Sequence, residues 1–425
     1  MSTFIPANPG QPQTAQPASR LADVVLGCVV LAAAALIGVN AWSQMPTTVA
    51  VLLLPVLMNQ VKVRFFPYMV AVAYFASAAV ELPGVIARFF PDGQPLAVSW
   101  GAPALLTLIQ ALPFLIYNPR GPGRQRAFRM VVALVLLTVP PIGLLAWMNP
   151  LFAAGVLFPG TGYGGLLLAT ATLAALAAAG DQAMRRPVFI AAAAILACSI
   201  VANEAARRNA PEPMHRWMGV DTTLEPAALR DPMQIRSELP GSKVGDMAAH
   251  FLNASTDVIV FPESVFDPLT AADRVALTPQ ALEAKRQGIV ILAGAVLPDG
   301  TGGWRNTLMA FGASEGVVAE ARVPMPMGNW RLSGGVTPRP FASDLALVET
   351  RHGPVSAAVS ICYEDTLIWP HFGLLSGRAV VLVSAGNAWA TGGTRGDRTQ
   401  QVSVHLLARL AGVPLVRAQN KWDHP

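Results

Sequence analysis

Long apolar segments dominate the first half of the chain and constrain its fold more than any other feature. Between residues 21 and 204 they recur at close to the roughly 20 residues that a helix needs to cross a bilayer. The segment from Val24 to Val39 is apolar on all sides, whereas a helix in a large soluble core would carry an amphipathic stripe. These segments therefore predict a polytopic α-helical membrane region.

We expect seven transmembrane helices, although the second and sixth segments are short or interrupted by glycine, so that six or eight would also fit. The predicted spans are 22–41, 46–60, 67–86, 98–117, 129–148, 164–180 and 187–204. Because further spans follow the first, it is expected to be an uncleaved anchor rather than a signal peptide. The Pro- and Gln-rich residues 1–20 predict a disordered cytoplasmic tail.

The charges are few and unevenly divided. Charged residues make up 13% of the chain, against about 25% in typical domains, and the net charge is +5. Residues 206–425 hold equal numbers of basic and acidic side chains, so the whole excess lies in residues 1–205. A nucleic-acid-binding protein needs a basic face on a folded domain. We therefore expect no direct binding to nucleic acid.

The positions of the basic residues predict the orientation in the membrane, because cytoplasmic loops are enriched in Lys and Arg. With the N-terminus inside, the outside loops carry only Arg88. The inside segments carry Arg20, Lys62, Arg64, Arg120, Arg124, Arg126, Arg129, Arg185 and Arg186. An odd number of spans then places residues 206–425 outside. In a bacterium this predicts a multi-pass inner-membrane protein with a periplasmic C-terminal domain.

Residues 206–425 alternate short apolar runs with helical segments, which predicts an α/β domain. Runs such as VIVFP and AVVLVSA are apolar at consecutive positions, as in strands covered on both faces. The expected strands are 217–222, 258–262, 288–296, 307–311, 355–361, 379–384 and 414–418, and the expected helices are 243–253, 270–287 and 399–411. No nucleotide-binding glycine motif or zinc spacing occurs, so we expect neither cofactor nor metal.

Three polar segments follow strands in this domain, at the strand ends where open α/β sheets place their sites. In VIVFPES, Glu263 fits either a general base with a raised pKa or a residue beside a helix N-cap. In VSAAVSICYEDT, Cys362 fits either a nucleophile or a buried structural thiol. The third segment, VLVSAGNAWATGGTRGD, fits either a surface loop or a wall of a site with Asn387 and Trp389 facing the pocket.

The cysteine count singles out Cys362. Cys28 and Cys198 lie in predicted spans, so Cys362 is the one thiol of the outside domain and has no partner there for a disulfide. A solitary thiol in an oxidising compartment is usually lost or kept for its chemistry.

Together, "PES", "ICYE" and the "NAW" about 25 residues later resemble the nitrilase (carbon-nitrogen hydrolase) superfamily. The "ICYE" form after a polytopic N-terminal half is most similar to apolipoprotein N-acyltransferase. The resemblance implies an αββα sandwich and a triad of Glu, Lys and Cys. It makes Glu263 the general base, Cys362 the acyl-accepting nucleophile and Glu364 a supporting carboxylate, with Tyr363, Asn387 and Trp389 at the substrate.

The sequence departs from that pattern at the lysine. The segment EARVPMPMGNW has Ala321 and Arg322 where the family has Lys. Arg322 could stabilise an oxyanion but could not exchange a proton, since its pKa exceeds about 12. Asn329 replaces a family glutamate, and the chain ends at Pro425, soon after the "RAQN" strand. With these departures the chain looks like the TraB proteins of plasmid conjugal transfer systems.

Two functions remain open from the sequence. In the first, Cys362 forms a thioester with an acyl group from a lipid or lipoprotein and passes it to an amine or water. In the second, the domain is a catalytically degenerate, membrane-anchored component that contacts proteins of the conjugation apparatus. A transporter is disfavoured because the predicted spans carry few ionisable groups.

Overall fold

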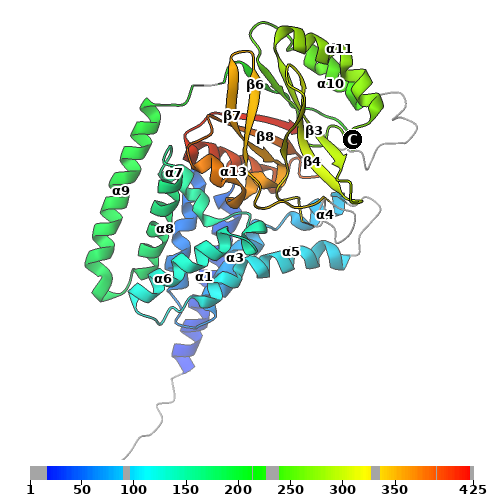
Figure 1. Cartoon of the computed structure of the whole chain (residues 1–425). Coiled ribbons are helices and arrows are strands. Elements are labelled where there is room, and N and C mark those ends of the chain that lie inside the picture. The colour runs from blue at the N-terminus through cyan, green and yellow to red at the C-terminus, as the bar shows by residue number, and fades with distance from the viewer. Residues whose placement is uncertain are drawn as a thin grey trace, which may run out of the picture.

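The computed structural model describes residues 17–89, 96–212, 214–225, 239–326, 336–388 and 390–421. It consists of a helical half, formed by the first part of the chain, and an α/β domain that lies above it in Figure 1. The long helix α9 (Arg185–Arg208) ends the helical half, and the first strand of the α/β domain, β1, follows at Trp217–Gly219.

Helices occur in every apolar segment for which a span was predicted. The α-helices are α1 (Pro17–Ala41), α2 (Leu54–Met58), α3 (Phe66–Ala78), α4 (Leu82–Phe89), α5 (Leu96–Ala111), α6 (Gly123–Thr138), α7 (Ala154–Leu157), α8 (Tyr163–Ala178) and α9. Short 3-10 segments connect several of them, namely η1 (Pro46–Leu53), η2 (Leu112–Ile116), η3 (Ile142–Leu144), η4 (Pro150–Ala153) and η5 (Gln182–Met184).

Within the described residues, three helical segments are long and apolar enough to cross a membrane by length and composition: Leu21–Ala41, Ala97–Ile116 and Arg186–Arg208. The pair α3 and α4 would make a fourth span, but it bends by 50° at the break between the two helices. The helical segments 46–58 and 163–178 are apolar and shorter. The expectation of seven spans stays a prediction.

A buried core joins most of the helical half. In it, the Trp42 indole donates a hydrogen bond to the Tyr74 hydroxyl (3.0 Å), which in turn donates to the Met148 carbonyl (2.9 Å). Both aromatic side chains are buried. This satisfies their polar atoms, which would otherwise be costly to bury. The helix α9 differs, because it lies at the edge of the helical half beside α8 and most of its side chains are exposed.

The α/β domain contains two sheets among its described residues. The first has the strand order β1–β2–β3–β4–β5 and the second β6–β7–β8–β9. The strands after β1 are β2 (Val258–Val260), β3 (Val290–Pro298), β4 (Trp304–Gly312), β5 (Gly316–Glu320), β6 (Leu345–Thr350), β7 (Gly353–Ile361), β8 (Val381–Asn387) and β9 (Leu415–Asn420).

These sheets form the middle of four layers. Apolar side chains of both sheets, including Val260, Leu292, Val359 and Val383, share one buried core. On its other face the first sheet packs against α10 (Pro240–Ala249) and α11 (Ala271–Gln287). The second sheet packs against α13 (Arg395–Ala411) and the helical half. The α/β class predicted from the sequence is therefore confirmed.

The strand ends needed for a site lie together in the second sheet. Strands β7, β8 and β9 are parallel, so their carboxyl ends share one edge, as the consecutive apolar runs predict. Strands β5 and β6 were not predicted from the sequence. Both pair antiparallel with a neighbour and are only partly buried, so neither has the continuous apolar run that marked the other strands.

The helical half and the α/β domain are in direct contact through α13. The Arg409 Nε atom donates a hydrogen bond to the Gly155 carbonyl on α7 (2.9 Å), and its Nη2 atom donates to Asn203 Oδ1 on α9 (2.8 Å). A Cβ atom added at Gly155 would collide with the backbone carbonyl of Leu406 on α13. Only glycine therefore permits this approach of the two helices.

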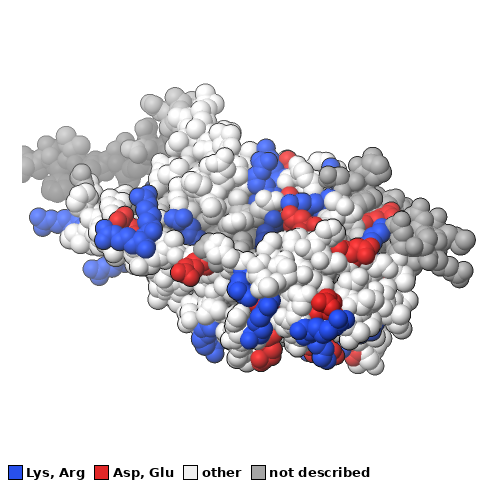
Figure 2. All heavy atoms as spheres, turned by 90° about the horizontal axis from the view of Figure 1, so that it is seen from above, with Lys and Arg blue, Asp and Glu red and all other residues white. Residues whose placement is uncertain are grey.

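On the α/β domain, seen from above in Figure 2, basic and acidic side chains are interspersed. Several form ion pairs, such as Arg305 with Glu320 and Arg286 with Glu283.

Gly155→Ala should separate α7 from α13, because the added methyl group would meet the backbone of Leu406. We expect it to lower the free energy of unfolding by about 1–3 kcal/mol, the usual cost of overpacking. The matched control is Gly164→Ala on α8, where an added Cβ atom has no neighbour within 4 Å. The control should be neutral or stabilising by up to about 1 kcal/mol, because alanine favours the helix. Thermal unfolding in detergent compares the two, and equal effects would contradict the close packing described here.

Candidate active site

Cys362 lies directly after β7 and begins the short helical turn η8 (Cys362–Thr366). Its backbone φ is +50°, in the left-handed region that residues other than glycine rarely adopt. Such a conformation costs on the order of 1–3 kcal/mol and persists only where the surroundings fix it. The thiol is half-buried and lies 3.9 Å from the backbone carbonyl of Asn387, at the end of the neighbouring strand β8.

The turn that carries Cys362 is held by the buried carboxylate of Glu364. Its oxygens accept hydrogen bonds from the backbone N–H groups of Ile361 (3.1 Å), Arg322 (2.5 Å) and Val323 (3.0 Å). The Arg322 guanidinium forms an ion pair with the same carboxylate at 2.5 Å and donates to the Val359 carbonyl at 2.7 Å. Glu364 thus joins the end of β7 to the segment after β5.

A second buried carboxylate, Asp365, holds the other side of the turn. It accepts hydrogen bonds from the hydroxyls of Ser360 and Ser384 and from the Gln400 amide. The same Gln400 nitrogen donates to the Cys362 carbonyl (3.0 Å), so α13 contacts the backbone of the cysteine directly. Burial raises the pKa of Asp365 to about 6, although the surrounding hydrogen bonds oppose the shift.

Glu263 follows β2 and reaches the cysteine from the first sheet. Its buried carboxylate accepts a hydrogen bond from the Asn306 amide (2.5 Å) and one from the Cys362 thiol. Burial raises the pKa of Glu263 to about 7, while these two hydrogen bonds oppose the shift. Gly294 on β3 permits the arrangement, because a Cβ atom there would collide with the backbone at Pro262 and Glu263.

The thiol itself is held in its neutral form. Burial raises the pKa of Cys362 well above its usual range, and the negative charge of Glu263 and the hydrogen bond to that carboxylate raise it further. A thiol with so high a pKa cannot be a preformed thiolate at neutral pH. It needs a base to take its proton as it attacks, and Glu263, with its pKa near neutrality, is placed to do so.

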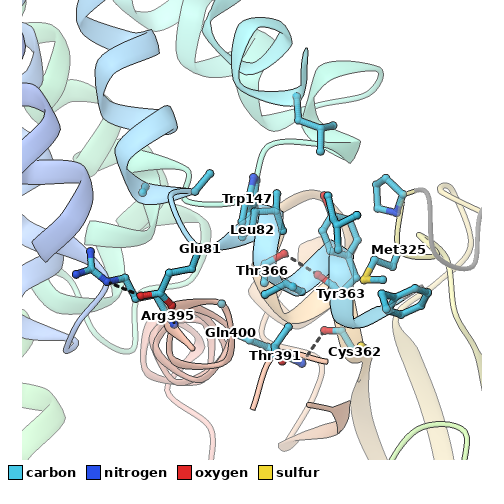
Figure 3. Close-up of a pocket in the computed structure, with 18 of the residues that line it drawn as sticks. Glu81, Leu82, Trp147, Met325, Cys362, Tyr363, Thr366, Thr391, Arg395 and Gln400 are labelled. Carbon is cyan, nitrogen blue, oxygen red and sulfur yellow. Dashed lines mark hydrogen bonds and ion pairs between the residues drawn. The ribbon is translucent and has the colours of Figure 1, made fainter. Parts of the chain in front are cut away.

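A largely apolar cavity of about 140 Å³ opens beside the thiol, between the two halves of the molecule. Figure 3 shows Leu82 and Trp147, from the helical half, on one side of it and Cys362, Thr391 and Gln400, from the α/β domain, on the other. Further apolar lining comes from α4, where Val85 and Ile86 contribute. The cavity therefore suits an apolar group next to the thiol.

A charged contact lines the cavity on one side. The Glu81 carboxylate pairs with the Arg395 guanidinium (3.2 Å) and also accepts the backbone N–H of Arg395 (2.7 Å). Both residues line the cavity, and Figure 3 shows the pair where the α3–α4 bend meets the start of α13.

The predicted site residues fall into three groups. Glu263, Cys362 and Asn387 lie together around the thiol, and Tyr363 lines the cavity, with its hydroxyl donating to the Leu144 carbonyl (3.2 Å). Arg322 and Glu364 are close by but bind each other beneath the turn. Trp389 and Asn329 lie outside the described residues.

Three polar residues that contact this centre were not predicted from the sequence: Asn306, Asp365 and Gln400. Asp365 sits in the motif itself, but neither of the amides stands near a recognisable motif, so only the fold brings them to the thiol. Among the described residues, no cluster of three or more His, Cys, Asp and Glu side chains could hold a metal ion.

Comparison with known proteins finds relatives among conjugal transfer proteins. The chain is 30% identical over 411 residues to "Conjugal transfer protein TraB" of Agrobacterium fabrum (strain C58), covering 90% of each chain. It is 29% identical over 399 residues to "Probable conjugal transfer protein TraB" of Sinorhizobium fredii (strain NBRC 101917 / NGR234), covering 91% of this chain and 96% of the relative. No model of a known protein family matches the chain.

Solved structures with partial similarity include an amidase and a carbon-nitrogen hydrolase. An amidase from Nesterenkonia sp. is 16% identical, with a TM-score of 0.32, covering 48% of this chain and 76% of its own. A carbon-nitrogen hydrolase from Helicobacter pylori G27 is 13% identical, with a TM-score of 0.33, covering 42% of this chain and 68% of its own.

Glu263→Gln should change how stability depends on pH. A carboxyl whose pKa is raised on folding, here from 4.5 to about 7, stabilises the protein fully below pH 4.5 and loses that contribution as the pH rises to 7. The loss is on the order of 3 kcal/mol. The glutamine variant keeps the acceptor for Asn306 but cannot ionise, so it should lose less stability than the wild type between pH 4.5 and 7.5. If the free energy of unfolding changes with pH in the same way in the wild type and in Glu263→Gln over that window, the pKa of Glu263 is not raised.

Arg322→Met should be strongly destabilising, by about 3–5 kcal/mol, because it leaves the Glu364 charge buried without its partner. The double variant Arg322→Met/Glu364→Gln removes that charge but keeps an acceptor for the backbone, so it should recover part of the loss. Arg286→Met, which breaks an exposed pair with Glu283, is the control and should cost less than about 1 kcal/mol. Chemical unfolding in detergent measures all three, and an Arg322 variant as stable as the control contradicts the role assigned to the pair.

Proposed function

Because the chain belongs to the TraB family of conjugal transfer proteins, we propose that it is a membrane-anchored component of a conjugal transfer system that carries an acyl group on Cys362. The proposal has three parts: insertion of the helical half in the bacterial inner membrane, base-assisted attack by the thiol, and an apolar acyl donor. Each part rests on a different feature of the molecule.

Exposed apolar helices support membrane insertion. On α9 the side chains of Phe189 and Val201 are 75% and 67% exposed, and α1 likewise exposes Val24 and Leu36. Such surfaces are unfavourable in water and suit a lipid environment. The bias of Lys and Arg toward alternate loops favours a cytoplasmic N-terminus, and with an odd number of spans the α/β domain is then periplasmic.

The observation that carries the proposed chemistry is the position of the Cys362 thiol between a buried carboxylate and an apolar cavity. The carboxylate supplies a base and the cavity admits an apolar chain. Because residues of the helical half line the cavity, an acyl chain could reach the thiol from the membrane side. An acyl phospholipid or a lipoprotein is the class of donor that fits.

In the proposed reaction, Glu263 takes the proton of the Cys362 thiol as the sulfur bonds to the carbonyl carbon of the donor ester. The tetrahedral intermediate collapses with cleavage of the ester C–O bond, and Glu263 returns the proton to the leaving alkoxide. A thioester remains on Cys362. An amine or water then attacks the thioester carbonyl carbon while Glu263 accepts the proton of that nucleophile. The C–S bond breaks, the acyl group leaves as an amide or a carboxylic acid, and Glu263 gives its proton to the departing thiolate of Cys362.

Arg322 has a structural part in this proposal. Its guanidinium is committed to Glu364 and to the Val359 carbonyl, so it secures the turn that presents the thiol. This arrangement also favours a second candidate function, a catalytically degenerate domain that contacts other conjugation proteins. Among the described residues that line the cavity, the cation is Arg395, which is paired with Glu81.

Transfer of a label from lipid to protein separates the two functions. The purified protein, reconstituted in vesicles with a phospholipid that carries a fluorescent acyl chain, should acquire a label that hydroxylamine releases, because hydroxylamine cleaves thioesters. Cys362→Ala should abolish the label and Glu263→Gln should reduce it by about 100-fold or more, the usual contribution of a general base.

The matched control is Cys198→Ala, which removes an exposed thiol on α9 and should leave labelling unchanged. If the wild type gains no thioester, or if Cys362→Ala is labelled as well as the wild type, the acyl-transfer function is wrong. Normal plasmid transfer by Cys362→Ala in donor cells would then favour the non-enzymatic candidate.

A further inference from the structure

Four aromatic rings form a continuous row where the α/β domain meets the helical half. Ring centroids are 5.7 Å apart between Tyr163 and Phe372, 4.9 Å between Phe372 and Trp369, and 5.8 Å between Trp369 and Phe341. The Tyr163–Phe372 and Phe341–Trp369 pairs are edge-on, an arrangement that aromatic pairs prefer, and the Trp369–Phe372 pair is tilted at 59°. We call these four residues the aromatic ledge.

The ledge is open on one side. Phe341 is 79% exposed and Tyr163 is 40% exposed, although both are large apolar rings. The polar atoms of the ledge bind backbone carbonyls: the Tyr163 hydroxyl donates to Phe372 (2.7 Å) and the Trp369 indole donates to Pro340 (2.8 Å). The exposed part is therefore mainly apolar, which marks a surface that meets another apolar phase.

The position of the ledge points to the lipid bilayer as that apolar phase. Tyr163 is the first residue of α8, an apolar helix of the helical half. Aromatic residues gather at the ends of membrane helices, where their rings lie among the lipid headgroups. Arg378, which is exposed, follows α12 (Phe372–Leu375), the helix that begins with the ring of Phe372, and its Nε atom donates a hydrogen bond to the Ser376 hydroxyl (3.0 Å). A cation beside exposed aromatic rings complements the phosphates of a phospholipid surface.

We propose that the aromatic ledge and Arg378 dock the α/β domain on the phospholipid surface of the bilayer that holds the helices. The inference rests on the proposed membrane insertion and adds a contact between the α/β domain and the lipid headgroups.

Docking there would fix the depth of the thiol. One connection after β7 carries both features: it begins with Cys362 in η8, continues through η9 (Trp369–His371) and ends in α12 (Phe372–Leu375). Trp369 and Phe372 are therefore tied to the cysteine by a short, folded stretch of chain. With the ledge at the headgroups, the cavity lies next to the bilayer surface, within reach of an acyl chain.

Depth-dependent quenching tests the inference. In a background of Cys28→Ser, Cys198→Ser and Cys362→Ala, single cysteines are labelled with a small environment-sensitive fluorophore and the full chain is reconstituted in vesicles containing acidic phospholipid. The ledge reporters are Phe341→Cys, in the ledge itself, and Ser376→Cys, at the exposed residue that follows α12, which leaves all four rings intact. Lipids with a nitroxide near the carbonyl of the acyl chain then serve as quenchers.

Both ledge reporters should be quenched at least about two-fold more than a reporter at Val275→Cys, because an interfacial group lies about 5–10 Å into the headgroup region. Val275 is 72% exposed and belongs to α11, which Figure 1 shows on the far side of the domain from the helical half. Val201→Cys on α9 reports insertion of the helices themselves.

The outcomes distinguish the two proposals. Quenching at Val201→Cys with ledge reporters no better quenched than Val275→Cys overturns the docking and leaves membrane insertion standing. Absence of quenching at Val201→Cys overturns both. At high protein density, a second copy of the chain could cover the ledge. Nitroxide quenching of the ledge reporters would then be lost, and energy transfer between fluorophores on neighbouring copies would appear. That result also overturns the docking on lipid. Since Cys362 is replaced throughout, catalytic failure cannot mimic any of these results.

Discussion

The buried carboxylate of Glu364 is the interaction on which the site depends. It collects three backbone N–H groups and the Arg322 guanidinium, and so fixes the end of β7 against the segment after β5. Only with that end fixed can the next residue, Cys362, keep its left-handed backbone. Burying such an ion pair costs desolvation energy, and the attraction between the charges offsets it only when additional hydrogen bonds satisfy the remaining lone pairs and protons. The ion pair therefore positions the turn that carries Cys362, and the Arg322 guanidinium is committed to Glu364 and to the Val359 carbonyl.

The same constraint orders the rest of the molecule around the thiol. Glu263 comes from the first sheet, Asn387 from the second, Gln400 from α13 and Leu82 from the helical half, so four parts of the chain converge on one cysteine. The close approach of α7 to α13 at Gly155 keeps the helical half against the domain and thereby preserves the cavity wall. The helical half and the candidate site thus form one structural unit, which is the physical basis for proposing that the substrate is a lipid or lipoprotein.

Much of this could be predicted from the sequence, for reasons that particular residues make clear. The buried parallel strands were predictable from their runs of consecutive apolar residues. Glu263 and Cys362 each follow such a run, so it was predictable that they lie close together at the strand ends. Asn306 and Gln400 were not, because a single amide on an antiparallel strand or on a helix carries no local signal and only the fold brings it to the site. The pairing of Arg322 with Glu364 was hidden for the same reason, because 42 residues separate them and the sequence predicted a separate role for each, oxyanion stabilisation for Arg322 and support of the cysteine for Glu364. The relationship to conjugal transfer proteins, predicted from the departures in EARVPMPMGNW, is confirmed by the relatives.

The central claim is that burial keeps the Cys362 thiol neutral and makes Glu263 its base. The rate of alkylation of Cys362 by iodoacetamide, followed by mass spectrometry of the peptide that contains it, tests this without any knowledge of the substrate. In the wild type the rate should rise through about pH 7, where Glu263 loses its proton and can begin to accept that of the thiol. In Glu263→Gln that rise should vanish, and Cys362 should be alkylated only at pH values above the usual pKa of a cysteine thiol. If the two proteins show the same profile, centred on the ordinary pKa of a cysteine, then Glu263 does not control the thiol and the account is wrong.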